Sequence, residues 1–434
     1  MRITRLLRAV TSTVVNRREL MPGVLAAACG GATESWVHAR EQMSLAADWV
    51  HLAAFLLAPH PRPVAEAIAA LREAFDTNPE IAFEDHVTER ERAIEREAAA
   101  FVGGRDDEVA ITTGTTAGLG LVYGGFHLRG GDEVITTTHD HYATHESLRL
   151  AAARSGARVR KIALYEADSA NVTEGALVDR LLGAIAPRTR ALAITWVHSS
   201  SGVKLPVARI AGELAAVNAA RPPDERVLLA LDAAHALGVE EADVVVLGCD
   251  VLVAGCHKWL FGPRGTGLVW ASAAAWPRIA ATIPSTNDVA SKRAWLAGAD
   301  PTGAMTGRRL TPGGMQAYDH RWALPAAFAH HRALGAAAIA SRSRALATRA
   351  KRALAAVPGV TLRTPLDPAL SSGIVCFDVA GLPPFEVTER LRKARVLAGA
   401  TPYATSHVRF GTPWFLTDDE VDRAVAAVAA LCRG

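Results

Sequence analysis

The 434-residue chain has few cysteines, and none of them forms a closely spaced pair. No CxxC motif is present, so the sequence predicts neither a cysteine-based zinc site nor a disulfide framework. The five cysteines are Cys29, Cys249, Cys256, Cys376 and Cys432.

Long apolar runs and a strong net charge are also missing. No stretch reaches the roughly 18 apolar residues that a membrane-spanning helix requires, so we expect no transmembrane segment. The formal net charge is +3, and no basic block with interleaved aromatic residues is present, so we expect no nucleic-acid partner. The chain is 50% hydrophobic and 21% charged, which is typical of a folded protein with a sizeable core.

Acidic residues are missing from the first 18 positions, which include the pair Arg17–Arg18. This pair, a short apolar run and small residues resemble a twin-arginine export signal, which carries folded, cofactor-loaded proteins to the periplasm. The alternative is a basic arm over residues 1–45 that packs on the protein or on a partner subunit of a cytoplasmic enzyme. A further alternative makes Cys29 a lipid-attachment cysteine.

Strand and helix patterns alternate over residues 105–272. Short β-rich runs such as VLLALD and DVLVAG are separated by alanine-rich helical stretches. Such alternation predicts an α/β fold with a mostly parallel sheet that helices cover on both faces. We expect a large domain over residues 46–325 and a smaller α/β domain over residues 326–434, joined by a long helix.

Polar residues follow several strand patterns, at the edge where ligands bind in open parallel sheets. Thr115 and Thr116 come at a predicted helix start, where free backbone N–H groups suit a phosphate, although threonine is also an ordinary helix cap. The stretch HDHYATH, residues 139–145, has metal-ligand spacing, or it places Tyr142 to stack on a flat cofactor. Ser200 ends a further strand and either binds a ligand oxygen or shapes a loop.

Two ionisable residues end neighbouring apolar runs. Asp232 ends VLLALD, and a buried carboxylate there needs a cationic partner unless it caps the next helix. Lys258 follows DVLVAG, and a buried lysine loses its proton readily and then forms imines with aldehydes. A phosphate site, a stacking ring, an acid for a ring nitrogen and an imine-forming lysine together indicate pyridoxal phosphate.

The sequence resembles the class V aminotransferase family of fold type I pyridoxal-phosphate enzymes, particularly its isopenicillin N epimerase-like branch. The resemblance runs from about Asp48 to the C-terminus. It implies a mostly parallel seven-stranded sheet with helices on both faces, a smaller C-terminal α/β domain and a homodimer. The motifs that carry it are TTGTTAGL, HDHYA, HSSSGVKLP, DAAHALG, HKWLFGPRGTG, TPGGMQAYDHRWALPAAF and VRFGTPWFLTDDEVD.

The resemblance also implies roles around the cofactor ring. Lys258 is the catalytic residue that holds the cofactor as a Schiff base. Asp232 pairs with the pyridine N–H. Tyr142 stacks on the ring, while His235 and Ser200 lie near its phenolic oxygen.

Further residues are implied at the phosphate and at the substrate. Arg409 binds the α-carboxylate of an amino acid, a task that suits a planar bidentate fork. Contacts to the phosphate come from Thr115, Thr116 and His257, and from Thr311 or Gly314 of the other subunit.

The implied reaction starts when neutral Lys258 takes the proton from the α-carbon of an amino acid. Epimerisation or transamination follows, and the alternative is a C–S or β-lyase acting on a cysteine-derived substrate. Cysteine desulfurases of the family have a cysteine shortly before the arginine, whereas residues 397–409 have none, which argues against persulfide chemistry. Two hypotheses from other classes are a metal hydrolase built on HDHYATH and a non-catalytic binding protein.

The early segment DWVHLAAFLLAPHPRP also departs from many relatives. Trp49, His51 and Phe55 either shape a pocket for an apolar or imidazole-like side chain, or pack as an ordinary apolar segment.

Overall fold

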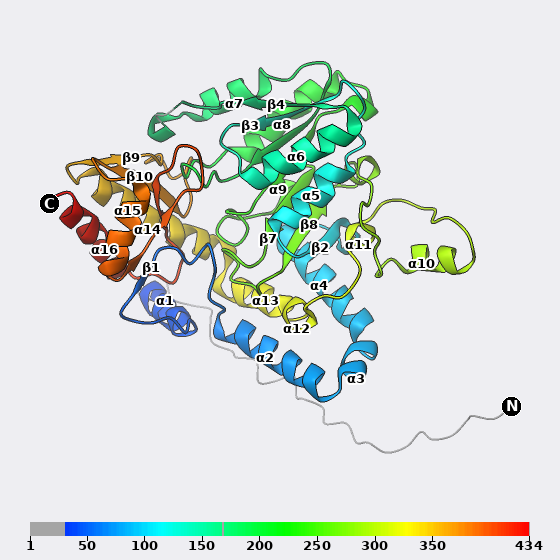
Figure 1. Cartoon of the computed structure of the whole chain (residues 1–434), viewed down its shortest axis with the longest axis horizontal. Coiled ribbons are helices and arrows are strands. Elements are labelled where there is room, and N and C mark those ends of the chain that lie inside the picture. The colour runs from blue at the N-terminus through cyan, green and yellow to red at the C-terminus, as the bar shows by residue number, and fades with distance from the viewer. Residues whose placement is uncertain (1–30, 167–168, 434) are drawn as a thin grey trace.

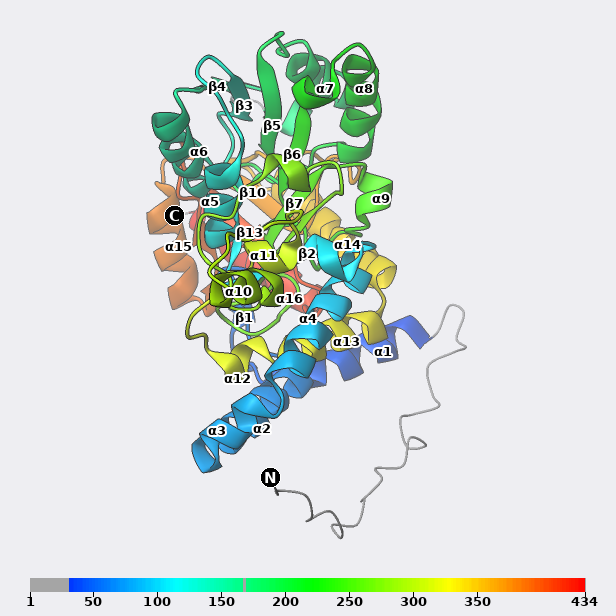
Figure 2. The same ribbon diagram turned by 90° about the vertical axis from the view of Figure 1, so that its right-hand side faces the viewer.

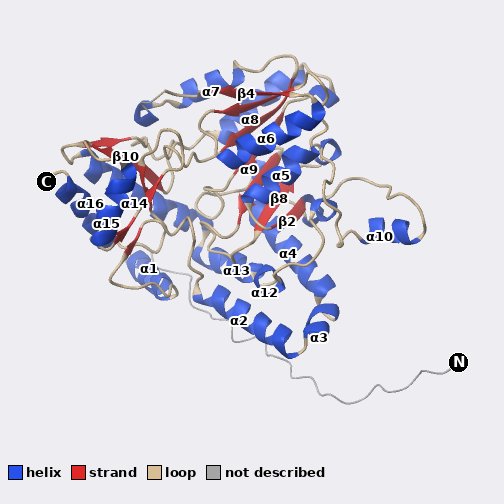
Figure 3. Cartoon of the chain, in the orientation of Figure 1, coloured by secondary structure: helices blue, strands red, loops and turns tan. Residues whose placement is uncertain are grey.

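The strands of the computed structural model form two main groups (Figures 1 and 3). The structure describes residues 31–166 and 169–433. The candidate export signal at Arg17–Arg18 and the candidate lipid site at Cys29 lie outside these residues. In the part of the chain that the structure describes, no helix is both long and apolar enough to cross a bilayer.

The larger group is a seven-stranded sheet, as the resemblance implies. Only β8 runs antiparallel to its neighbours, and the other strands share one direction. The carboxyl ends of these six strands therefore meet at one edge of the sheet. In spatial order the strands are β2 (Val109–Thr112), β8 (Gly267–Ala271), β7 (Val251–Gly255), β6 (Leu228–Asp232), β5 (Thr189–Thr195), β3 (Glu133–Thr137) and β4 (Arg158–Ile162).

Both faces of this sheet are buried, because successive side chains of each strand enter different cores. In β5, Leu192 and Ile194 pack into one hydrophobic core, whereas Ala191 and Ala193 pack into the other. Figure 2 shows α5 (Thr115–Gly125) and α6 (Tyr142–Ser155) on one side of the sheet, with α8 (Val207–Ala219) and α9 (Val244–Leu247) on the other.

The remaining helices of the larger part complete these layers. Figure 1 shows α10 on a long loop that projects away from the body of the protein. These helices are α2 (Arg62–Thr77), α3 (Pro79–Glu84), α4 (Val87–Val102), α7 (Glu174–Leu182), α10 (Val289–Leu296), α11 (Gly307–Leu310), α12 (Tyr318–Arg321) and α13 (Leu324–Leu334).

The smaller group is an antiparallel sheet of four strands in the C-terminal part. Its core is closed by α14 (Ala336–Ala355), α15 (Pro384–Lys393) and α16 (Asp418–Leu431). In spatial order its strands are β12 (Gly399–Ala400), β13 (Val408–Gly411), β10 (Ile374–Val379) and β9 (Val360–Leu362).

The segment before α2 packs with this smaller part. It begins with α1 (Gly31–Glu41), and β1 (Val50–His51) pairs in parallel with β11 (Val396–Leu397). Met43, Val50 and Leu52 share the hydrophobic core of the smaller sheet. We expected residues 46–325 to form the large domain, but the first residues of this range, including Val50 and Leu52, belong to the core of the smaller part.

The expected long helix after residue 324 is two helices. Gly335 separates α13 from α14 and has φ of 86°, a left-handed conformation that glycine adopts without steric penalty. The break redirects the chain from the large sheet toward the small one.

Candidate active site

A cavity lies at the carboxyl edge of the large sheet, where the small part covers it. Its walls come from segments that are distant in the sequence. The lining residues are Leu56, Thr115, Thr116, His141, Ala143, Thr195, Ser199, Asp232, Ala234, His235, Lys258, Pro402 and Arg409.

Lys258 enters this cavity from the loop that follows β7. Backbone hydrogen bonds close this loop at its base: Cys256 N–H donates to Thr266 O at 2.9 Å, and Gly262 N–H donates to Cys256 O at 2.9 Å. Burial lowers the pKa of Lys258 to about 8; Asp232 opposes this shift and Arg409 adds to it. A sizeable neutral fraction of the amine is therefore available near neutral pH, as a nucleophile or base requires.

Asp232 ends β6, the strand next to β7, and lines the same cavity. Its carboxylate accepts from Ala234 N–H at 2.9 Å and from the Thr144 hydroxyl at 3.3 Å. Burial raises the pKa of Asp232, while the Ala234 bond and the charge of Lys258 counteract the rise. The ionised form thus gains from a further buried cation, such as a protonated ring nitrogen.

The start of α5 forms the polar end of the cavity. Thr115 and Thr116 are its first two residues, and both line the cavity. Among the described residues, no group forms a hydrogen bond with the buried Oγ1 of Thr115. The ring of His257 packs against Gly114 and Gly255, and its Nδ1 lies 3.1 Å from Thr266 O. An unpartnered hydroxyl beside helix N–H groups suits a phosphate.

Arg409 comes from β13 of the small part and is buried at the cavity wall. One guanidinium nitrogen donates to Ser199 O at 3.2 Å, whereas its buried Nε has no hydrogen-bond partner in the described part of the chain. Burial lowers the pKa of Arg409, although arginine stays charged in proteins. A buried cation with an unused donor indicates a binding site for an anion such as a carboxylate.

Phe55 lies under this arginine. The guanidinium carbon of Arg409 is 4.7 Å from the centroid of the Phe55 ring. The ring also covers Gly411, where a Cβ atom would lie 2.0 Å from Cδ1 of Phe55. Trp49 and His51 lie outside the cavity, because Trp49 packs against Arg395 and His51 bonds to Ala46 O. Leu56, which the sequence analysis did not select, lines the cavity instead.

Tyr142 does not lie where the resemblance places a stacking ring. It is the first residue of α6, its side chain is 70% exposed, and it does not line the cavity. Its neighbour His141 does, and Nδ1 of His141 caps α6 by accepting from Ala143 N–H at 3.1 Å. The aromatic candidate at the cavity is therefore His141.

A similar one-residue offset separates Ser200 from the site. Ser200 Oγ donates to His139 O at 3.4 Å and does not line the cavity. Ser199 lines it, and its hydroxyl bonds to Tyr403 Oη at 2.7 Å. Tyr403 lies in residues 397–409, where desulfurases of the family have a cysteine.

Thr311 is used within its own chain. It is buried, its hydroxyl donates to Gly307 O at 3.1 Å, and its oxygen accepts from Ile111 N–H at 3.0 Å. To donate to the cofactor of another subunit, the Thr311 hydroxyl would have to give up its bond to Gly307 O. Gly314 lies in the following loop beside Met315, which is 90% exposed, and of the two candidates only Gly314 is at the surface.

The three histidines of HDHYATH diverge. The ring of His139 stacks on Tyr165 with a centroid distance of 3.7 Å, and Nε2 of His145 lies 2.8 Å from Thr137 O. Over residues 31–166 and 169–433, no three histidine, cysteine or acidic side chains come together as metal ligands could. The geometry does not favour the metal-hydrolase hypothesis.

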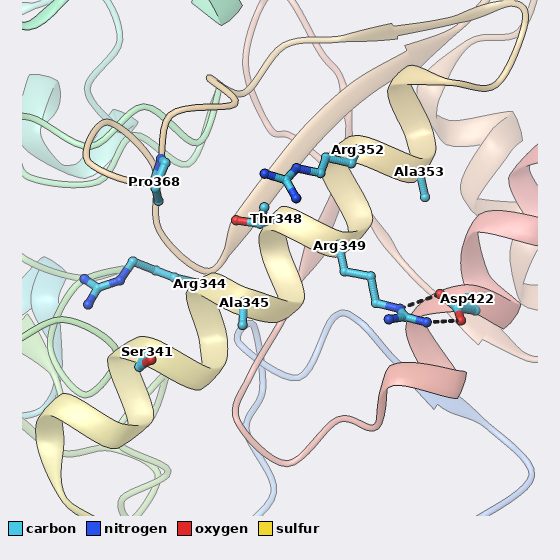
Figure 4. A pocket seen from close by; sticks show the side chains of 9 residues that line it. All are labelled: Ser341, Arg344, Ala345, Thr348, Arg349, Arg352, Ala353, Pro368 and Asp422. Atoms are coloured by element: carbon cyan, nitrogen blue, oxygen red, sulfur yellow. Dashed lines mark hydrogen bonds and ion pairs between the residues drawn. The ribbon is translucent and has the colours of Figure 1, made fainter. Parts of the chain in front are cut away.

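A second hollow lies along α14, away from the residues described above. Figure 4 shows its wall of polar and basic side chains, in which Arg349 turns toward Asp422 and donates to it at 2.7 Å. None of the predicted site residues lines it. Its lining is Ser341, Arg344, Ala345, Thr348, Arg349, Arg352, Ala353, Pro368 and Asp422.

The residues at the sheet edge fit pyridoxal phosphate. Thr115 offers a buried donor without a partner to an anion, Asp232 offers a buried carboxylate to a ring nitrogen, and Lys258 offers an amine of lowered pKa. All three line one cavity.

Comparison with known proteins identifies the family of the chain. The family model for aminotransferase class V matches residues 58–416. The chain belongs to the aminotransferase class V family.

Relatives of two kinds within this class V family are similar to the chain. Isopenicillin N epimerase of Streptomyces clavuligerus is 28% identical over 410 residues, which cover 92% of this chain and 99% of the relative. Isopenicillin N epimerase of Amycolatopsis lactamdurans is 27% identical over 92% of this chain and 99% of the relative. A cysteine desulfurase of Klebsiella pneumoniae is 29% identical over 79% of this chain and 82% of the relative.

Solved structures show the same fold. A complex of a cystine C–S lyase with its product cysteine persulfide matches with a TM-score of 0.79 and 22% identity, over 88% of this chain and 98% of the lyase. A cysteine desulfurase from Escherichia coli matches with a TM-score of 0.76 and 22% identity, over 92% of this chain and 98% of that one.

The offset between Tyr142 and His141 generates a prediction. His141→Ala should weaken pyridoxal-phosphate affinity about two- to tenfold, because aromatic contacts contribute about 0.5–1.5 kcal/mol beyond the buried area. Tyr142→Ala is the matched control and should leave affinity unchanged, since its ring is outside the cavity. Absorbance titration of protein freed of cofactor measures both. Equal weakening by the two substitutions would contradict the placement of His141.

Proposed function

We propose that this class V enzyme uses pyridoxal phosphate to act at the α-carbon of an amino acid, by epimerisation or transamination. The observation that supports it most is the common cavity of Lys258, Asp232 and Arg409. These side chains provide an amine of lowered pKa, a buried carboxylate and a buried cation with an unused donor.

Each residue has a separable task in this proposal. Lys258 would hold the cofactor covalently through its amine, and Asp232 would keep the ring nitrogen protonated. Arg409 would orient the substrate by its α-carboxylate. Bound pyridoxal phosphate supplies an electron-poor ring that stabilises negative charge at the substrate α-carbon.

The proton transfer falls to Lys258. With its amine free, Lys258 would act as the base at the substrate α-carbon, and its pKa of about 8 suits proton exchange near neutral pH. Protonation of the α-carbon on the face opposite Lys258 would give epimerisation and would need a second acid on that face, whereas transamination would need Lys258 to carry the proton away from the α-carbon.

Thiol chemistry has no support at this cavity. Its lining residues include no cysteine, and Tyr403 occupies the loop before Arg409. Cys376 is buried in β10, and burial raises the pKa of its thiol to about 12, so a reactive thiolate is disfavoured. A β-lyase that needs no active-site thiol is the second candidate, because the same three side chains also suit elimination.

We further propose that the enzyme is a homodimer in which the loop around Gly314 reaches the neighbouring site. The exposed, left-handed Gly314 (φ 95°) and the exposed Met315 support this arrangement. Light scattering on the purified enzyme tests it, and a monomer that retains full activity would refute it.

Export remains a proposal that rests on Arg17–Arg18. Cell fractionation of wild type and Arg17→Lys/Arg18→Lys tests it; if both proteins stay in the cytoplasm, the export signal is ruled out.

The reaction is tested by spectroscopy and isotope exchange. Wild type should take up pyridoxal phosphate and absorb visible light, and Lys258→Ala should lose the band of the covalent form. In deuterated water without a keto acid, epimerisation places deuterium on the α-carbon of recovered substrate. Transamination instead requires a keto-acid acceptor, and a lyase releases pyruvate without one.

The proposed function fails if wild-type protein stays colourless and binds no pyridoxal phosphate. If pyruvate forms and no deuterium enters the amino acid, the reaction is that of the second candidate, a β-lyase, and not epimerisation or transamination.

A further inference from the structure

His235 lies between two nitrogen partners inside the cavity wall. The indole Nε1 of Trp259 donates to Nδ1 of His235 at 3.2 Å. On the other side of the ring, Nε2 of His235 lies 3.3 Å from Nζ of Lys258. An indole N–H donates and cannot accept, so Nδ1 of His235 is an acceptor and carries no proton.

This bond determines where the imidazole proton resides. A neutral ring carries a single proton, which must then be on Nε2, and a charged ring would need a second proton on Nδ1. The opposite ring flip would place carbon atoms at both contacts and lose both bonds. Burial lowers the pKa of His235 well below its usual value, and the neighbouring charges of Lys258 and Arg409 and the ring of His141 act in the same direction.

We propose that Trp259 is a positioning residue that holds His235 as the neutral Nε2–H tautomer, so that His235 donates a hydrogen bond to the Lys258 nitrogen. Only an unprotonated amine can accept this bond, because an ammonium group has no lone pair. The arrangement therefore favours the neutral, reactive form of the lysine. The role of this neutral lysine in catalysis rests on the proposed function, whereas the tautomer of His235 does not depend on that function.

The indole itself has little freedom to turn away. Trp259 is buried, and its ring stacks on Phe55 with a centroid distance of 5.5 Å and an interplanar angle of 9°. At the edge of the indole, a Cβ atom at Gly373 would lie 2.9 Å from Cη2 and Cζ3, so a side chain there would force the ring to shift. Phe55 also meets His235 edge-on at 5.7 Å.

Other charged and titratable groups face Lys258 from several elements. Asp232 of β6 raises the pKa of Lys258, and Arg409 of β13 lowers it. Two histidines also lie within electrostatic reach of Lys258: His141, which precedes α6, and His257, which directly precedes the lysine in the chain. A substitution at Trp259 leaves all of these groups in place, which makes it a selective probe of the His235 contact.

The test compares Trp259→Phe with Trp270→Phe. Trp270 is also buried, and its Nε1 donates to Glu108 Oε2 at 3.1 Å in a different part of the fold, so it is a matched control. Full-length protein freed of cofactor is labelled with 15N-histidine, and its NMR spectrum is assigned with His235→Gln. One-bond proton coupling identifies which ring nitrogen carries the proton.

Wild type and Trp270→Phe should show a proton on Nε2 of His235 and none on Nδ1. Trp259→Phe should show protonated Nδ1, because the acceptor role of that atom is lost. Wild-type protein alone can refute the proposal: a proton on its Nδ1 would do so even if the variant failed to fold.

A second readout follows the lysine. In Trp259→Phe, Nε2 of His235 can accept from the ammonium form, so the pKa of Lys258 should rise by about one unit. The pH midpoint for the rate of pyridoxal-phosphate attachment should move upward accordingly, and Trp270→Phe should not move it. An unchanged midpoint in Trp259→Phe would overturn the positioning role. Nε2–H in wild type together with no cofactor uptake would refute the proposed function and leave the tautomer standing.

Discussion

The site depends on burying one amine and one carboxylate at the ends of adjacent parallel strands. Asp232 ends β6 and pairs in register with Val253 of β7, and the lysine follows five residues later. Burial lowers the pKa of Lys258 and raises the pKa of Asp232. Both shifts favour the neutral form of the side chain. The charged forms of Lys258 and Asp232 both cost free energy in this cavity unless they have a partner. One planar molecule with an aldehyde for the amine and a ring nitrogen for the carboxylate provides a partner for each side chain.

The rest of the fold brings other segments to this pair. The small sheet supplies Arg409, which bonds across to Ser199 O of the large part. The early segment supplies Phe55, which packs on Arg409, on His235 and on Trp259. One aromatic ring therefore contacts Arg409, His235 and Trp259, which come from distant parts of the sequence.

Strand ends made much of this site predictable. The alternating pattern located Thr115, Asp232 and Lys258, because a parallel sheet gathers the carboxyl ends of its strands at one edge. It could not distinguish His141 from Tyr142 or Ser199 from Ser200. Each step along a helix start or a tight loop turns the side chain by a large angle, so an error of one residue in the predicted start of α6 selects the wrong side chain.

Other features depend on long-range contacts that no local pattern reports. The hydroxyl of Thr311 bonds to Ile111, 200 positions away in the chain, whereas the family resemblance implied Thr311 or Gly314 as a contact to the cofactor of the other subunit. The bond from Trp259 to His235 depends on how the loop after Lys258 folds back, so the motif HKWLFGPRGTG alone does not predict it.

The central claim is that Lys258 holds the cofactor. Borohydride reduction of the enzyme loaded with pyridoxal phosphate, followed by peptide mass spectrometry, tests it most directly. The account predicts one stable pyridoxyl adduct, on the peptide that contains Lys258. An adduct on a different lysine, or none with cofactor bound, would contradict it.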